Sequence, residues 1–229
     1  MASENVFMER YLTPLAVLLG AVLITLGLIF GGGLGTSGTS DEPAAAAEVD
    51  VNDIETDNSP SVGQKDAPVT VVVWYDFQCR YCKQFESATL SEVEKNYVAN
   101  GQVRIVYKDF QFLGPESIEA AIYSRAVWEA HPDRWHEWFK RMLTGESESA
   151  PSLAGMNEIS TSLGLDAARI TQLMNDNKAK YQEAVDADRD EGIKFGVDST
   201  PSTVIGKALI KGAQPIATVS AAIDAELKK

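Results

Sequence analysis

Cysteine, histidine and basic residues are scarce in this sequence of 229 residues. It contains two cysteines, Cys79 and Cys82, and a single pair excludes a framework of several disulfide bonds. Lys and Arg number 20 against 33 Asp and Glu, which gives a formal charge of −13. Nucleic-acid binding needs a basic surface, so this acidic balance argues against that class of protein. Whatever chemistry the cysteines carry out, they carry it out together.

Charge is also missing from a long stretch near the N-terminus. Leu12 to Phe30 contains no charged residue, and as a helix this run would be about 30 Å long, which matches the hydrocarbon core of a bilayer. We therefore expect a transmembrane helix over residues 11–30, after a short N-terminus of residues 1–10. A cleaved signal peptide is the alternative, but its apolar region is typically shorter and small residues follow it closely, whereas here residues 44–47 come well beyond the run.

Basic residues indicate how this helix would be oriented. Arg10 precedes the apolar run, and the next Lys or Arg after it is Lys65. The positive-inside rule therefore predicts a cytoplasmic N-terminus, with the rest of the chain outside the cell membrane. Residues 31–62 combine Gly, Ser, Thr, Ala and acidic residues without a base, so we expect a disordered acidic linker there.

The remaining sequence, residues 63–229, alternates between strand and helix patterns and predicts an α/β domain. Residues 69–74 form a nearly continuous apolar run, as in a central strand covered on both faces. Apolar residues at helical spacing follow the cysteines as far as Asn100, and residues 103–110 alternate like a second strand. The other expected elements are a helical insertion over about 115–192, strands over 202–205 and 208–210, and a closing helix over 216–227.

The Cys-x-x-Cys pair lies where the first strand gives way to the helix. Unpaired backbone N–H groups and the helix dipole stabilise an anion at a helix N-terminus, so we expect Cys79 to have a lowered pKa and to be the exposed nucleophile. Arg80 and Lys83 add positive charge, and Arg80 and Tyr81 are the residues expected to tune the thiolate. Cys82, one turn further along, would be the more buried resolving thiol.

Two other roles for the cysteine pair are open. A zinc site would need the only histidines, His131 and His136, but they lie much further along the chain than the roughly 12 to 15 residues of finger-type sites. A purely structural disulfide would close so short a loop that it would stabilise the fold only weakly. A redox role is therefore favoured over both, and no metal is expected.

Three segments of the chain resemble one known family when they are taken in order. They are residues 66–71 leading to residues 75–83, then residues 195–204, then residues 212–215. They resemble the DsbA-type disulfide oxidoreductases of the thioredoxin fold, in particular the membrane-anchored bacterial ones. The resemblance covers roughly residues 63–229 and implies a thioredoxin-like fold with a helical insertion. A Cys-x-x-Cys pair alone also occurs in zinc proteins, so the ordered set is what is specific.

The resemblance also implies roles for single residues. Cys79 would be the nucleophile and Cys82 the resolving thiol, while Pro201 would follow a cis peptide bond and face them. Thr200 would offer backbone groups to an extended substrate. Without this context, Thr200 and Pro201 would be interpreted as an ordinary trans turn before a strand, because few X-Pro bonds in folded proteins are cis.

The sequence departs from the family in three places. Arg80 and Tyr81 separate the cysteines where many relatives have proline first, and Ser199 replaces a glycine. Val73 stands where many thioredoxin-fold enzymes carry a buried acid before the first cysteine. Asp76 lies closer to the cysteines, and its candidate roles are proton transfer and a cap at the strand end. These changes leave the reaction class unaltered and its direction open.

Together these features predict an extracytoplasmic thiol-disulfide oxidoreductase, tethered to the cell membrane by its own N-terminal helix. Its substrates would be exported proteins with free thiols or disulfides, and the resemblance implies a quinone-linked membrane partner that reoxidises it. No cofactor is expected. Oxidation, isomerisation and reduction all stay open, because direction depends on the reduction potential relative to the surroundings. The alternative is a non-catalytic tethered chaperone or metal-binding module that uses the same cysteine pair.

Overall fold

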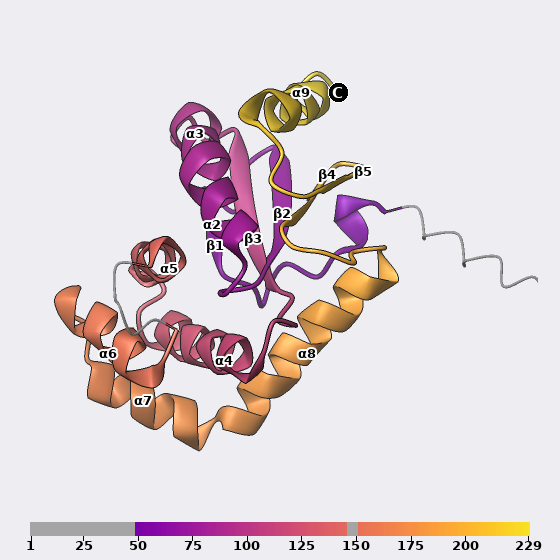
Figure 1. Ribbon diagram of the computed structural model, residues 1–229. Coiled ribbons are helices and arrows are strands. Elements are labelled where there is room, and N and C mark those ends of the chain that lie inside the picture. The colour runs from indigo at the N-terminus through magenta and orange to yellow at the C-terminus, as the bar shows by residue number, and fades with distance from the viewer. Residues whose placement is uncertain (1–48, 146–150) are drawn as a thin grey trace, which may run out of the picture. The chain divides into compact units, whose positions relative to one another are not determined.

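The computed structural model describes residues 49–145 and 151–229 (Figure 1). The N-terminus expected over 1–10, the transmembrane helix expected over 11–30 and the first part of the expected linker lie outside the described residues. Within the described ranges, no helix is long and apolar enough to cross a membrane.

A five-stranded mixed sheet forms the centre of the domain, in the order β1-β3-β2-β4-β5. Its two middle strands, β2 (Val69–Tyr75) and β3 (Val103–Asp109), run parallel to each other. On one side β1 (Ser61–Val62) pairs antiparallel with β3. On the other side β4 (Ser202–Ile205) pairs antiparallel with β2, and β5 (Ala208–Lys211) pairs antiparallel with β4.

The apolar run of β2 is explained by its place in the middle of this sheet. Side chains alternate between the two faces of a strand, and both faces of β2 are covered. Val71, Val73 and Tyr75 belong to one buried core, which also includes side chains of the helices on that face. Val72 and Trp74 belong to a second buried core on the opposite face, so no residue of β2 is left exposed.

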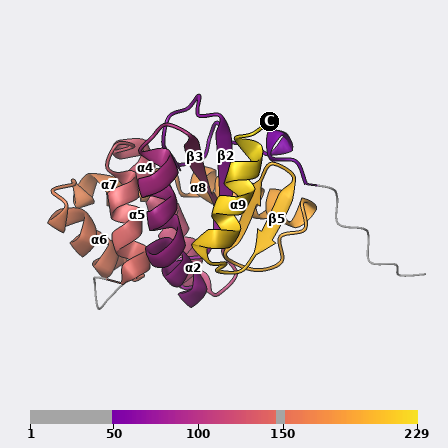
Figure 2. The same cartoon turned by 90° about the horizontal axis from the view of Figure 1, so that it is seen from above.

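One helical segment follows β2 and contains two π-helical turns. It consists of α2 (Arg80–Phe85), the π turn η2 (Glu86–Leu90), α3 (Ser91–Val93) and the π turn η3 (Glu94–Val98). This segment and the C-terminal helix α9 (Ile216–Glu226) lie in front of the sheet in Figure 2, and α8 (Lys178–Lys194) lies behind it.

The expected insertion is a block of helices beside the sheet (Figure 1). Its elements are α4 (Pro115–Ala130), α5 (Trp135–Thr144), α6 (Leu153–Ser162), α7 (Ala167–Asp176) and α8 (Lys178–Lys194). Aromatic side chains join it to the sheet: Phe139 of α5 packs edge-on against Tyr75, with ring centroids 4.8 Å apart. The described residues thus form a thioredoxin-like α/β fold with a helical insertion, as the sequence predicts.

The prediction of a disordered linker over residues 31–62 is wrong for residues 49–62. Val49 and Ile54 are buried in the second core together with Trp74. Between these two apolar residues, Asp50 caps the short 3-10 helix η1 (Val51–Asp53). Composition alone predicted disorder here, but two apolar anchors and the pairing of β1 order the segment against the sheet.

Candidate active site

The two cysteines lie at the junction between β2 and α2. Cys79 is the N-cap residue of α2, and its carbonyl accepts hydrogen bonds from the backbone N–H groups of Cys82 and Lys83. The two thiols are not bonded to each other in this structure. Cys79 was expected to be exposed, but only 6% of its surface is accessible, against 3% for Cys82.

The loop before β4 covers Cys79 and explains its burial. The Thr200–Pro201 peptide bond is cis, as the resemblance implies. The Thr200 carbonyl oxygen lies 3.3 Å from the Sγ atom of Cys79. Pro201 lines a small cavity together with Cys82. Two segments that are distant in the sequence therefore meet at the cysteine pair.

The two thiols have opposite pKa shifts. The Cys82 thiol, which donates a hydrogen bond to Cys79, lowers the pKa of Cys79 to about 6, and the backbone N–H groups of Cys82 and Tyr81 act in the same direction against the effect of burial. Burial raises the pKa of Cys82 far above that of an ordinary thiol, and the neighbouring Cys79 raises it further. Because the thiolate is the nucleophile in disulfide exchange, this arrangement makes Cys79 the reactive group at neutral pH.

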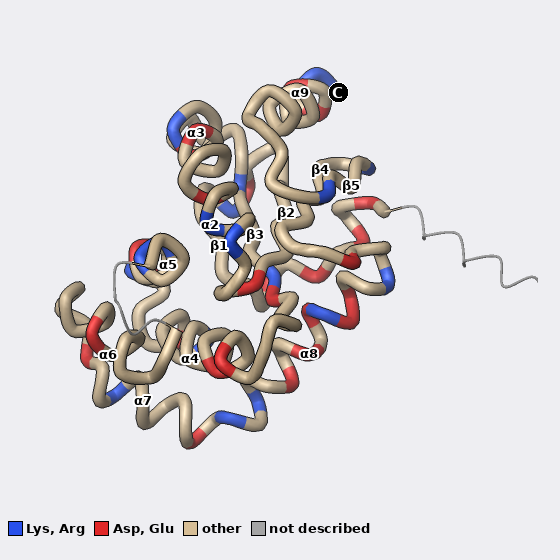
Figure 3. The backbone as a smooth tube through the Cα atoms, viewed as in Figure 1, with Lys and Arg blue, Asp and Glu red and all other residues tan. Residues whose placement is uncertain are grey.

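The residues between the cysteines lie on the surface. The guanidinium of Arg80 lies over the Tyr81 ring, 5.2 Å from its centroid, and 52% of Tyr81 is exposed. Figure 3 shows basic residues on α2, which carries Arg80 and Lys83. Tyr81 acts on Cys79 through its backbone N–H. An effect of the Arg80 and Tyr81 side chains on the Cys79 thiolate stays a prediction.

Asp76 is a cap at the end of β2. Its carboxylate is fully buried and accepts hydrogen bonds from the backbone N–H groups of Gln78, Phe112 and Leu113 and from the Ser117 hydroxyl. All these donors belong to loops and to the start of α4 that border the cysteines. Of its two candidate roles, the geometry favours the cap, since four donors occupy the carboxylate.

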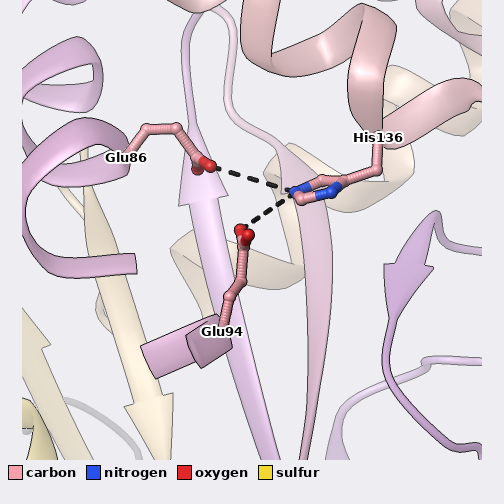
Figure 4. A group of neighbouring side chains, drawn as sticks. All are labelled: Glu86, Glu94 and His136. Atoms are coloured by element: carbon pink, nitrogen blue, oxygen red, sulfur yellow. Dashed lines mark ion pairs between the residues drawn. The ribbon is translucent and has the colours of Figure 1, made fainter. Parts of the chain in front are cut away.

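A buried acidic residue that the sequence reasoning missed lies on the same helical segment. Glu86 begins the π turn η2, and 1% of its surface is exposed. In Figure 4 its carboxylate and that of Glu94 point toward the imidazole of His136. Nε2 of His136 lies 3.1 Å from Glu94 and 3.9 Å from Glu86. The available signal was spacing, because residues four apart on a helix share a face, and Glu86 follows Cys82 by that distance.

Lys140 supplies a cation to this group. Clusters of carboxylates and imidazole hold metal ions in many proteins, but here the ammonium of Lys140 lies 2.9 Å from Glu94 and 3.9 Å from Glu86. In the part of the chain that the structure describes, neither cysteine joins a histidine in a cluster of this kind. The zinc alternative built on His131 and His136 therefore has no geometric support.

The small cavity joins this acidic group to the cysteines. It has a volume of about 10 Å³, close to the space of one water molecule. Val73, Cys82, Glu86 and Pro201 all line it. Val73, one of the departures from the family noted in the sequence, and Glu86 line this cavity from different elements.

Comparison with known proteins agrees with this geometry. A family model described as "Thioredoxin" matches residues 55–225. The chain is 28% identical over 177 residues to the disulfide bond formation protein D of Bacillus subtilis, which covers 74% of this chain and 77% of the relative.

Solved structures show the same fold. The oxidised BdbD of Bacillus subtilis superposes with a TM-score of 0.68 at 24% identity, covering 75% of this chain and 94% of that one. The thiol-disulfide exchange protein α-DsbA2 of Wolbachia pipientis gives 0.66 at 22% identity, covering 73% and 86%. With the cysteine pair at the head of α2 and a cis-proline loop against it, the chain belongs to the thioredoxin family and is a thiol-disulfide oxidoreductase of the DsbA type.

Proposed function

We propose that this protein introduces disulfide bonds into exported proteins from an extracytoplasmic position at the cell membrane. The observation that carries the proposal is the contrast between the two thiols. The pKa of Cys79 is lowered to about 6, whereas burial raises that of Cys82. A disulfide is a good oxidant when one of its two cysteines is stable as a thiolate, because that thiolate leaves readily.

The reaction proceeds by two exchanges. A thiolate of the substrate attacks Sγ of Cys79, a new sulfur–sulfur bond forms, and the Cys79–Cys82 bond breaks with its electron pair on Cys82. A second thiolate of the substrate then attacks the substrate sulfur of this mixed disulfide, and Cys79 leaves as a thiolate. The substrate gains a disulfide, and the enzyme is left as a dithiol that must be reoxidised.

The surface around the cysteines supports an unfolded polypeptide as the substrate. Tyr81, Phe112 and Leu113 are large apolar residues, each roughly half exposed. Asp76 fixes the backbone of the loop that carries Phe112 and Leu113. The Thr200 carbonyl offers an acceptor beside Cys79 for an extended chain.

Trapping of the mixed disulfide tests the reaction. Cys82→Ala leaves the nucleophile without its resolving thiol and should accumulate mixed disulfides with exported proteins, detected by mass spectrometry after alkylation. Cys79→Ala is the matched control and should accumulate none. If neither variant forms such adducts, and the purified protein carries zinc or copper, a metal-binding module replaces the proposed enzyme.

The direction of the reaction is proposed from the compartment and the low pKa of Cys79. Disulfides persist outside the cytosol, which favours oxidation of substrates there, with a quinone-linked membrane partner restoring the disulfide. Equilibration of the pair in glutathione buffers measures its reduction potential. A potential near about −120 mV supports a disulfide donor, and one near about −270 mV would mean a reductase.

The membrane anchor is proposed from the uncharged run over residues 11–30 and from Arg10 before it. The full chain should stay with the membrane fraction after alkaline carbonate extraction, and a chain without residues 11–30 should not. Protease added to spheroplasts should digest the domain of the full chain. Survival of that domain until the membrane is permeabilised would reverse the proposed orientation.

A further inference from the structure

Glu86 is a buried acid without a close polar partner. Its side chain is 1% exposed, and neither carboxylate oxygen has a hydrogen-bond partner among the residues that the structure describes. Burying a carboxylate is costly unless it pairs closely with a cation or binds a metal ion. Burial and the neighbouring Glu94 raise the pKa of Glu86 to about 8, which shows how closely the two acids are held together.

Two other metal-ligating side chains lie beside Glu86. Nε2 of His136 is 3.9 Å from Oε1 of Glu86 and 3.1 Å from Oε1 of Glu94, and the three ligand atoms all lie within 4.8 Å of one another. Figure 4 shows both carboxylates pointing toward the same nitrogen of the imidazole. Oε1 of Glu94 has no hydrogen-bond partner in the described part of the chain either, so this oxygen and Nε2 lie side by side without the alignment of a hydrogen bond. Ligand atoms around a shared metal ion are arranged in this way.

The separations suit a small divalent transition metal. Zn²⁺ binds histidine nitrogen at about 2.0–2.1 Å and carboxylate oxygen at about 2.0–2.2 Å, which places the ligand atoms of a tetrahedral site about 3.4 Å apart. The separations of 3.1 and 3.9 Å lie on either side of this value. Three protein ligands and a fourth position open to water are a known arrangement for Zn²⁺. The imidazole favours Zn²⁺ over Ca²⁺ and Mg²⁺, which prefer oxygen ligands alone.

The groups that surround the three ligands leave room for an ion. The ammonium of Lys140 binds Oε2 of Glu94 at 2.9 Å and lies 3.9 Å from Glu86, so Oε1 of Glu94 stays available. Lys140 thereby orients the Glu94 carboxylate, as outer partners of metal ligands do. Its side chain is 33% exposed, so solvent screens its repulsion of a bound dication. The Tyr107 hydroxyl lies 3.3 Å from Nε2 of His136, a long hydrogen bond that a metal ion would replace.

The two π turns bring both acids to His136. Glu86 begins η2 and Glu94 begins η3. In a regular α-helix, residues eight apart differ in direction by about 80°. A π turn takes more residues per turn and changes which residues share a face, and such turns occur frequently at functional sites. An ion held by these three side chains would join the helical segment that follows the cysteines to α5 of the insertion.

We propose that Glu86, Glu94 and His136 bind a divalent transition metal ion, with Zn²⁺ as the expected occupant, and that this ion clamps the helical segment after the cysteines to α5. The site differs from the zinc alternative weighed for the cysteine pair, because its three ligands are two carboxylates and an imidazole and include no sulfur. No metal was expected from the sequence, where the histidines were considered only as partners of the cysteines.

Calorimetric titration of the oxidised full chain with ZnCl₂ tests the site. With Cys79 and Cys82 joined in a disulfide, their sulfurs are not available as thiolate ligands. We expect the wild type to bind one ion per chain more tightly than any further ions. His136→Gln should weaken this binding by at least about 100-fold, because even the loss of an outer partner of a metal ligand costs about 10- to 100-fold. His131→Gln is the matched control, since it removes the other histidine and should bind as the wild type does.

Two further measurements distinguish metal binding from a purely structural role of the cluster. Co²⁺ should give the oxidised wild type the visible absorption of an ion bound by nitrogen and oxygen, without a sulfur charge-transfer band, and His136→Gln should lose this absorption. Zn²⁺ should raise the thermal unfolding midpoint of the oxidised wild type, because an ion that binds only the folded state stabilises it. Glu94→Gln should lose both effects, whereas Glu92→Gln, on the same helical segment, should keep both.

The inference is overturned if the oxidised wild type binds no Zn²⁺ stoichiometrically, or if His136→Gln binds it as tightly as the wild type. Neither result affects the proposed function, because mixed disulfides form at the cysteine sulfurs whether or not the ion binds. A wild type that binds Zn²⁺ with the expected pattern but forms no mixed disulfides with exported proteins refutes the function and leaves the metal site in place.

Discussion

Two charged clusters each contain a buried acid, and they differ in how completely their charges are paired. The α8 cluster comprises Lys108, Asp109, Arg125, Asp188 and Glu191. The α5 cluster comprises Glu86, Glu94, His136 and Lys140. In the α8 cluster Arg125 pairs with both Asp109 and Asp188, and Lys108 pairs with Asp188 and Glu191. In the α5 cluster, Nε2 of His136 and Nζ of Lys140 each lie 3.9 Å from the Glu86 carboxylate.

The difference indicates which cluster serves stability and which serves chemistry. Burial raises the pKa of Asp188 in the α8 cluster, and the paired cations Arg125 and Lys108 oppose that rise and favour the charged carboxylate. Hydrogen bonds reinforce this cluster: the Tyr75 hydroxyl donates to Asp109, and Arg125 and Lys108 also donate to backbone carbonyls of Asn58 and Glu55. An acid that is buried without a close partner changes protonation within the working pH range, and only the α5 cluster borders Cys82.

Removing the central cation of the α8 cluster should have the largest effect on stability. Arg125→Met leaves Asp109 and Asp188 buried with a single remaining cation. Removal of one partner from a buried ion pair typically costs about 3–5 kcal/mol, and we expect a loss of that size in the free energy of unfolding, measured by urea denaturation. The rate of disulfide opening by dithiothreitol should stay unchanged in the folded protein. A slower rate with normal stability would contradict the division between the clusters.

Glu86→Gln should change how stability depends on pH. The pKa of Glu86 is about 8 in the folded protein against 4.5 for an ordinary Glu, so the folded state holds the proton more tightly. Its contribution is greatest below about pH 4.5 and is lost as the pH rises to about 8. Within that window the wild type should lose up to about 1.4 kcal/mol per pH unit relative to the variant. Parallel pH curves from urea denaturation of the two proteins would contradict the raised pKa.

The layout of the fold could be predicted from the sequence because its signals are local. The apolar run of β2, the helical spacing after Cys82 and the helical block before β4 depend on periodicity and turn residues. The position of Pro201 beside the cysteines was predicted from the family resemblance, because no local sequence pattern indicates it. Residues 49–62 were misjudged because two apolar anchors, Val49 and Ile54, lie within an acidic segment.

The α5 cluster could not be predicted, because it depends on contacts between elements that are distant in sequence. Glu86 looks like an ordinary helical residue in the sequence, and its burial results from the packing of α5 and β3 against the helical segment. The imidazole ring of His136 also stacks near the Phe139 ring, with the two centroids 6.4 Å apart. Its position beside Glu86 and Glu94 further depends on two π turns, which no pattern in the sequence predicts.

Lys140→Met removes the ammonium near the two acids of the α5 cluster. The substitution therefore increases the difference in charge pairing between the α5 and α8 clusters. Lys140 lowers the pKa of Glu86, so its removal should raise that pKa further. Because the ammonium is one-third exposed, we expect an upward shift of no more than about one pH unit in the upper end of the pH window over which Glu86 affects stability, measured by urea denaturation with and without Glu86→Gln. A downward shift would mean that Lys140 does not act on Glu86 through its charge.

We expect the smallest effect from breaking a surface ion pair, which serves as a reference for the other three predictions. Lys180 lies 2.8 Å from Glu129, as close as many of the buried pairs, but the two side chains are 66% and 40% exposed. Water screens such charges and the side chains lose conformational freedom on pairing, so exposed pairs contribute at most about 1 kcal/mol. Lys180→Met should therefore change the free energy of unfolding by less than about 0.5 kcal/mol and leave the disulfide rates unaltered. A loss comparable to that of Arg125→Met would show that distance alone, rather than burial, decides what a pair contributes in this protein.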